Sequence, residues 1–278
     1  MKTFTLTRRQ TLAGLTASTA LTLGGCAANG GMPRLRPMDT DPDEWLDSVS
    51  YRLLEHEPER ATGLGVDTGE FAYLRGKLED QSISGQREYA ATLRWVVDQM
   101  TGLDERGLTN DQATSFEVVR SAFSTAAEGF DLPYGDVAVG SWRNAPYVVI
   151  QNVGTYLDMP RFLDSSQPLT DEADTGYYLD RLASVDTALN GELERLEKAR
   201  SLGVIPPDFL LDKAIAAMEA SIESAPSDYV NPLEKAPEAI RSSAMTTAKR
   251  VTAQKIVPAL QRQLAELKTE RARANSNA

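Results

Sequence analysis

The sequence is poor in the side chains that most often carry enzyme chemistry. Its 278 residues contain one histidine, His56, and one cysteine, Cys26. A single cysteine cannot form an internal disulfide, and only His56 could act as a histidine base for a nucleophile. A zinc site of the H-E-x-x-H type needs a second histidine four residues on, where this chain has Arg60. We therefore exclude that site and interpret His56 as a polar residue at a helix end.

Basic residues and long apolar runs are also scarce. The chain has 29 Lys and Arg against 40 Asp and Glu, which gives a formal net charge of -11. A nucleic-acid partner is excluded on this basis, because binding phosphates needs clustered basic residues. No segment offers the roughly 20 apolar residues that a transmembrane helix requires. The 41% of hydrophobic residues suits a globular protein with a core of its own.

The first 26 residues are typical of an export signal. Arg8 and Arg9 in "TRRQTL" match a twin-arginine signal, and "LTLGGC" resembles the lipobox of bacterial lipoproteins, which implies a lipid on Cys26. The alternative is an incidental cysteine beside an ordinary cleavage site. We expect a signal peptide at 1–25, a flexible linker at 26–41 and a helical domain at 42–278. The mature protein is then periplasmic and bound to a lipid bilayer through acylated Cys26.

The rest of the chain predicts helices. Apolar residues recur at helical spacing in segments that start near Asp41, Ser82 and Thr109, and again from Thr170 to Gly203, after Pro207, and from 237 to 271. Pro58 ends the first helix or begins a new turn, "GLGVDTG" is interpreted as a turn, and Pro258 predicts a kink. The predicted fold is all-α, an array of long antiparallel helices with one irregular loop at 131–160.

That loop holds the candidate binding residues. It contains three prolines and three glycines, and long loops inside compact domains are often functional. Aromatic and amide side chains of the kind that line ligand sites gather there. The alternative is that they only pack the loop. The candidates are Trp142, Arg143, Asn144, Tyr147, Gln151 and Asn152.

Carboxylates are plentiful, but their spacing predicts solvated helix faces. Two groups stand out, Asp171 with Glu172 and Asp174, and Glu192 with Glu194 and Glu197. We expect most of them to face water rather than to form an acid and base pair. The sequence predicts no catalytic residue, no metal ligand and no cofactor on this chain.

Several ordered stretches resemble a bacterial family, domain of unknown function 885. They are "PERATGLG" from Pro58, "YVVIQNVGTYLDMPRFLD" from Tyr147, "YLDRL" at 178–182 and "GVIPPDFLLDKAI" at 203–215. Members of that family resemble helical zinc peptidases whose H-E-x-x-H-like element lies in the C-terminal half. The resemblance implies that this chain corresponds to the N-terminal half, so zinc is expected only with the other half, and the chain alone is expected to be inactive.

Two hypotheses follow. In the first, the chain is the non-catalytic N-terminal half of an exported, lipid-anchored zinc metallopeptidase-like protein, and it covers one side of a cleft for a peptide substrate while docking the C-terminal half. In the second, it is a complete non-enzymatic periplasmic lipoprotein that binds a peptide or protein partner. A fragment should leave an apolar helix face uncovered, whereas a complete module should not.

Overall fold

The computed structural model describes residues 41–103, 105–140 and 144–275. The export signal with Arg8 and Arg9, the lipidation residue Cys26 and the predicted boundary between residues 25 and 26 lie outside these residues. Trp142 and Arg143 lie outside them as well. The domain boundaries and the export signal therefore stay predictions.

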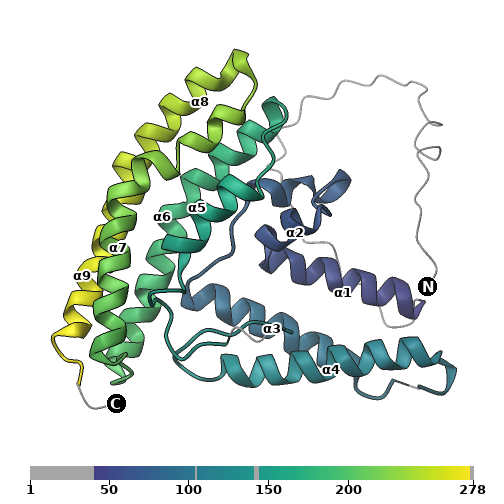
Figure 1. Cartoon of the computed structure of the whole chain (residues 1–278). Helices are drawn as coiled ribbons and strands as arrows, with labels where there is room; N and C mark the ends of the chain where they lie inside the picture. Colours follow the sequence, from purple (N-terminus) through teal and green to yellow (C-terminus); the bar gives the residue numbers. More distant parts are fainter. Residues whose placement is uncertain (1–40, 104, 141–143, 276–278) are drawn as a thin grey trace, which may run out of the picture. The chain divides into compact units, whose positions relative to one another are not determined.

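Helices make up almost all of the regular structure, so the all-α prediction is confirmed (Figure 1). Beside them, the described residues form only two isolated β-bridges, Asp136 with Ala145 and Ile150 with Val153. The helices are α1 (Pro42–His56), α2 (Pro58–Leu64), α3 (Ile83–Met100), α4 (Asn110–Phe130), α5 (Thr155–Ser165), α6 (Glu172–Ser201), α7 (Asp208–Asp228), α8 (Glu238–Val251) and α9 (Val257–Arg271). Short 3-10 helices are η1 (Gly69–Gly76), η2 (Glu105–Gly107) and η3 (Asn231–Lys235).

Local capping explains where the early helices begin. The Asp41 side chain accepts from the first-turn N–H groups of α1, and Pro42 follows at the first position, where a proline is tolerated. Ser82 caps α3, and Thr109 with Gln112 forms a capping box on α4. Pro58 starts α2, one of the two outcomes that the sequence allowed. Helix α6 is capped by Asp171, one residue after the predicted Thr170.

Two expectations need correction. The 131–160 region is irregular only to Gly154, because α5 begins at Thr155 and carries Pro160 inside it. The predicted single helix at 237–271 is instead α8 and α9 joined by a π-helical turn, η4 (Thr252–Ile256). Pro258 lacks the N–H that would bond to the carbonyl four residues back, so the chain widens in the turn before it.

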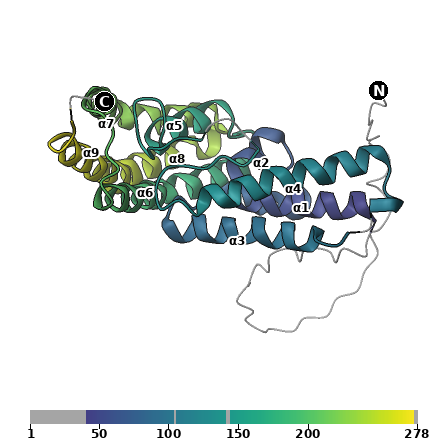
Figure 2. The same cartoon turned by 90° about the horizontal axis from the view of Figure 1, so that it is seen from below.

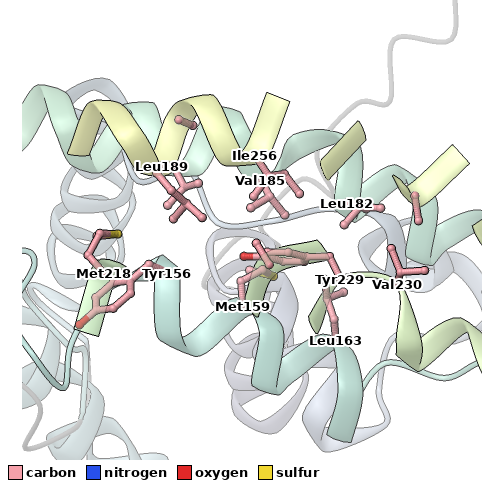
Figure 3. Packing of buried hydrophobic residues seen from close by; sticks show 14 of the residues in the cluster. Tyr156, Met159, Leu163, Leu182, Val185, Leu189, Met218, Tyr229, Val230 and Ile256 are labelled. Atoms are coloured by element: carbon pink, nitrogen blue, oxygen red, sulfur yellow. The ribbon is translucent and has the colours of Figure 1, made fainter. Parts of the chain in front are cut away.

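The core consists of two apolar clusters. Helices α1, α3 and α4 pack together around the first, which includes Trp45, Leu93 and Phe116 (Figure 2). The Trp45 and Phe116 rings stack with centroids 5.4 Å apart. Helices α5 to α9 surround the second. Figure 3 shows it from close by, with Tyr156, Met159 and Leu163 of α5 facing Leu182, Val185 and Leu189 of α6. None of the helices in the described ranges is long and apolar enough to cross a membrane.

Candidate functional site

Arg181, on α6, ties three segments together. The side chain is wholly buried, and its Nη2 donates to the Pro58 carbonyl at 3.1 Å, to Thr62 Oγ1 at 2.8 Å and to the Leu74 carbonyl at 3.0 Å. The guanidinium also lies 4.8 Å from the centre of the Phe162 ring. Burial lowers the pKa of Arg181 to about 10, so it remains charged at neutral pH. Helices α2 and α5 and the 3-10 helix η1 are thereby held against α6.

A second ion network holds η1 to α6. Arg75 Nη1 lies 2.9 Å from Asp174 Oδ1, and Arg75 Nη2 lies 3.3 Å from Asp67 Oδ1. Asp67 in turn accepts a hydrogen bond from Thr62 Oγ1 at 2.7 Å. Burial disfavours the ionised form of Asp174, but the hydrogen bonds from Thr170 and Arg75 outweigh it and lower the pKa. These contacts place the 67–80 segment beside the N-terminal part of α6.

Glu192, also on α6, caps helix α5. Its Oε1 accepts from the Thr155 backbone N at 2.7 Å and from Thr155 Oγ1 at 2.8 Å, while Oε2 accepts from Gln263 Nε2 at 2.9 Å. Gly154 precedes the helix with a φ of 132°, which favours glycine. Burial raises the pKa of Glu192 to about 7, although all three hydrogen bonds favour the carboxylate.

Between these groups lies a pocket of about 450 Å³, which we call the acidic pocket. It is bounded by the 57–60 and 79–81 segments, Tyr89 of α3, the 136–138 and 148–155 segments, and residues of α5 and α6. Its apolar wall includes Val148, Met159 and Phe162, and Arg60 is the one basic residue among the described residues that line it. The carboxylates that line it are Glu57, Glu59, Glu79, Asp136, Asp158 and Glu192.

These carboxylates differ in how they are held. Glu57 accepts from the Tyr89 hydroxyl at 2.6 Å and from Arg60 Nη1 at 2.9 Å. Both oxygens of Glu59 accept from the Glu79 backbone N at 3.2 Å. The Glu79 carboxyl accepts no hydrogen bond from the residues that the structure describes. Burial and then the neighbouring charge of Glu59 raise the pKa of Glu79 well above its usual value.

The arrangement suits binding of a cation better than catalysis. Carboxyl groups crowded in a partly buried pocket retain protons, and an incoming ammonium or guanidinium group would favour their ionised forms. Glu192, the carboxyl with a pKa near 7, already makes three hydrogen bonds that position α5. Across the described ranges no group of three or more His, Cys, Asp or Glu side chains is arranged to hold a metal ion.

His56 lies at the C-terminal end of α1, where the sequence placed it. Its ring stacks on the Tyr89 ring with centroids 4.6 Å apart, and its Nε2 lies 2.9 Å from Thr92 Oγ1. Burial, followed by the nearby charge of Arg52, lowers the pKa of His56 to about 4. The ring is therefore neutral at pH 7 and packs behind Tyr89, which itself lines the acidic pocket.

The loop residues predicted to bind a ligand are spread out. Asn144 is exposed, its Oδ1 accepts from the Ala138 backbone N, and it borders a separate hollow along α4. Tyr147 and Gln151 are half-buried and Asn152 is exposed. These four residues do not line the acidic pocket, whereas their loop neighbours Val148 and Val153 do. The predicted binding roles stay untested, and so do those of Trp142 and Arg143.

Sequence reasoning missed the acidic pocket because it assigned the carboxylates of α6 to water. Asp174 and Glu192 are each only 3% exposed. Glu192 does carry a signal, since it lies three residues after Leu189 and four before Leu196 and so falls on the apolar stripe of α6. Glu79 has no comparable signal, because its burial depends on how the 67–80 segment folds back onto α6.

Comparison with known proteins identifies the family. A model of the family described as "Bacterial protein of unknown function (DUF885)" matches residues 58–278. The chain belongs to this family. The DUF885 match begins at Pro58, so the resemblance drawn from "PERATGLG" and the later stretches is confirmed. No curated protein matches the chain.

One similar solved structure is a chain from Colwellia psychrerythraea described as a "putative lipoprotein". It shares 19% sequence identity with this DUF885 chain at a TM-score of 0.74, over 85% of this chain and 42% of its own length. At this identity the likeness shows a common fold. The present chain spans less than half of the length of the Colwellia protein.

Proposed function

We propose that this protein is an exported, lipid-anchored member of the DUF885 family that forms the substrate-binding, non-catalytic half of a peptidase-like protein in the periplasm. The twin-arginine and lipobox-like stretches support export and anchoring, as does the description of the Colwellia relative. The share of that relative covered by this chain supports the role of a half. In this proposal the acidic pocket holds the positively charged group of a peptide, such as its amino terminus.

The acidic pocket is the observation that carries this proposal. Among the described residues, six carboxylates and one basic side chain line this pocket, and apolar residues of α5 form another part of its wall. Such a combination fits an ammonium group next to an aliphatic side chain. The pocket also lies where the family-like stretches "PERATGLG", "YVVIQNVGTYLDMPRFLD" and "YLDRL" meet, through Arg181 and Phe162.

Binding is tested by calorimetry with a short leucine-rich peptide that has a free amino terminus, against the same peptide acetylated. We expect the free peptide to bind at least about tenfold more tightly, which corresponds to ~1.4 kcal/mol. Glu79→Gln should remove most of this preference without disturbing a hydrogen bond of the side chain. Glu223→Gln, which removes an exposed charge on α7, is the matched control. Equal affinities for the two peptides would refute a cation site here.

The membrane anchor is tested by fractionating cells that produce the whole chain. Wild-type protein should appear with the membranes and carry a lipid detectable by mass spectrometry. Cys26→Ser should lose the lipid and move to the soluble periplasmic extract, whereas replacing Arg8 and Arg9 by lysine should block export. A Cys26→Ser protein that stays in the membrane fraction would rule out the lipid anchor.

The role as one half is tested by reading the DNA that follows the codon for Ala278 in all three frames. A coding segment with H-E-x-x-H would support the peptidase-like proposal, and hydrolysis should then be assayed on the product of both parts. If no such segment occurs there or in a copurifying protein, the alternative of a non-enzymatic lipoprotein that binds a peptide or protein partner is favoured.

A further inference from the structure

A second pocket, of about 300 Å³, concentrates positive charge in an otherwise acidic protein. We call it the basic pocket. It lies between the first turns of α3, the segment from the end of α4 to Gly135, and α6. Asp131 is the one acidic residue among the described residues that line it, although the whole chain has a formal charge of -11. The four basic residues that line it are Arg87, Arg94, Arg195 and Lys198.

Two of these cations are fixed by the fold. Arg195 is 5% exposed, and its Nη2 donates to the Gly135 carbonyl at 2.8 Å and to Asp136 Oδ1 at 2.7 Å. Arg94 pairs with Asp131 and donates to the Ala127 carbonyl at 3.1 Å. These bonds hold the 131–136 segment against α3 and α6, so the wall of the pocket is built before any ligand arrives.

The other two cations, Arg87 and Lys198, lack an ion-pair partner among the residues that the structure describes. Within the described parts of the chain, neither Arg87 nor Lys198 forms an ion pair or a side-chain hydrogen bond. Glu194, four residues before Lys198, instead accepts from the Ile83 backbone N at 3.3 Å at the start of α3. Two exposed cations are therefore left facing one pocket, next to the buried charge of Arg195.

The remaining wall of the basic pocket is apolar. Ala90 and Phe130 lie beside the basic residues, and Leu132 and Tyr134 keep 53% and 38% of their surface exposed. A small hydrated anion would leave these side chains in water. A carboxylate attached to an apolar body would pair with Arg87 and Lys198 while covering the leucine and the tyrosine.

We propose that the basic pocket binds a carboxylate carried on a short apolar body. The carboxyl-terminal residue of a peptide and a medium-chain fatty acid share this chemistry. The site is separate from the acidic pocket, in charge and in most of its lining, and the inference does not rest on the proposed function.

The test uses calorimetry on the whole chain at low salt, where exposed charges act most strongly. N-acetyl-leucyl-phenylalanine is titrated as the free acid and as its amide, and neither has an amino group that could report on the acidic pocket. We expect the acid to bind roughly tenfold more tightly than the amide. Arg87→Gln and Lys198→Gln should each weaken binding of the acid roughly threefold and leave the amide unchanged.

Lys249→Gln is the matched control, because Lys249 is an exposed cation on α8 and does not line the pocket. Octanoate is titrated in parallel. Tighter binding of octanoate than of the dipeptide acid would assign the site to fatty acids, and the reverse would assign it to peptide ends, each in support of the shared chemistry. Equal binding of acid and amide, or an equal loss in Lys249→Gln, would overturn the proposal.

Discussion

At the scale of single residues, the most consequential side chains of this protein are buried charges. Arg181 donates from a fully buried position to backbone carbonyls of the 58–77 region and to Thr62, and Arg195 does the same for Gly135. Placing a guanidinium in the interior is costly unless its donors are satisfied. Here they are satisfied largely by backbone carbonyls, so each arginine fixes the path of the segment that carries those carbonyls.

Arg181→Lys should destabilise the fold strongly. A lysine ammonium cannot reach the set of acceptors that the planar guanidinium serves, so the carbonyls of Pro58, Leu74 and Lys77 would no longer all receive a hydrogen bond from this side chain. We expect the free energy of unfolding in urea, followed by circular dichroism, to fall by about 3 kcal/mol or more. Arg262→Lys is the control, since Arg262 bonds Asn190 on the surface, and it should change the value by less than ~1 kcal/mol. Similar losses in both variants would contradict this account of Arg181.

At the scale of elements, the sequence predicted the helix starts that are set by residues close together in the chain. The helix starts at Asp41, Ser82 and Thr109 were found because a cap and an apolar stripe lie within a few residues of each other. The start of α5 at Thr155 was missed because its cap, Glu192, comes from another helix. The 3-10 helix η1 was missed for a similar reason, since the ion pairs of Arg75 hold it in place.

A single position of helix α6, Gly191, determines how closely α3 can approach α6. A Cβ atom added at Gly191 would lie 2.6 Å from the Ser82 backbone N and 2.7 Å from the Gln81 carbonyl carbon, closer than real Cβ contacts. The absence of a side chain at this position lets the start of α3 lie directly on α6. The same approach brings Gln81 of the acidic pocket near Arg195 of the basic pocket, at 3.1 Å.

Gly191→Ala and Gly176→Ala should therefore have opposite effects, although both lie on α6. The first forces α3 away from α6, and we expect it to lower the free energy of unfolding by about 1 to 3 kcal/mol. The second meets nothing within 4 Å at an exposed helical position, and alanine should raise stability by roughly 0.5 to 1 kcal/mol. Thermal unfolding of the two variants beside the wild type checks the signs. Stabilisation by Gly191→Ala would show that the contact is not tight.

At the scale of the whole described region, polar contacts join the two apolar clusters. Arg181 connects α6 with α2, Arg195 connects it with the 135–136 segment, and α3 approaches it at Gly191. Both pockets lie at these junctions and take residues from α3 on one side and α6 on the other. No periodicity in the sequence marks such junctions. Their residues lie far apart in the chain, up to 135 positions in the case of Glu57 and Glu192 of the acidic pocket, which is why neither pocket could be predicted from the sequence.

Buried acids should make the stability of the protein fall as the pH rises. Burial raises the pKa of Glu270 to about 8, and that of Glu192 to about 7, while an unfolded glutamate has the ordinary value of 4.5. Above pH 4.5 the unfolded chain releases protons that the folded chain keeps, so the free energy of unfolding decreases until the pH passes the folded pKa. His56 acts in the opposite direction, but only between its folded pKa of about 4 and its unfolded value of 6.5.

Between pH 6.5 and 8, His56 no longer contributes to the pH dependence of stability, so the contribution of the buried acids can be measured there. We expect the free energy of unfolding in urea to decline across this range, by at most about 1.4 kcal/mol per pH unit for each group. Glu270→Gln should flatten the decline more than Glu192→Gln, because Glu270 has the higher pKa of the two and its buried Oε2 accepts no hydrogen bond within the described region. Glu223→Gln, on the exposed face of α7, should give a curve parallel to that of the wild type. If Glu270→Gln is also parallel, Glu270 is ionised in the folded protein and the decline has another origin.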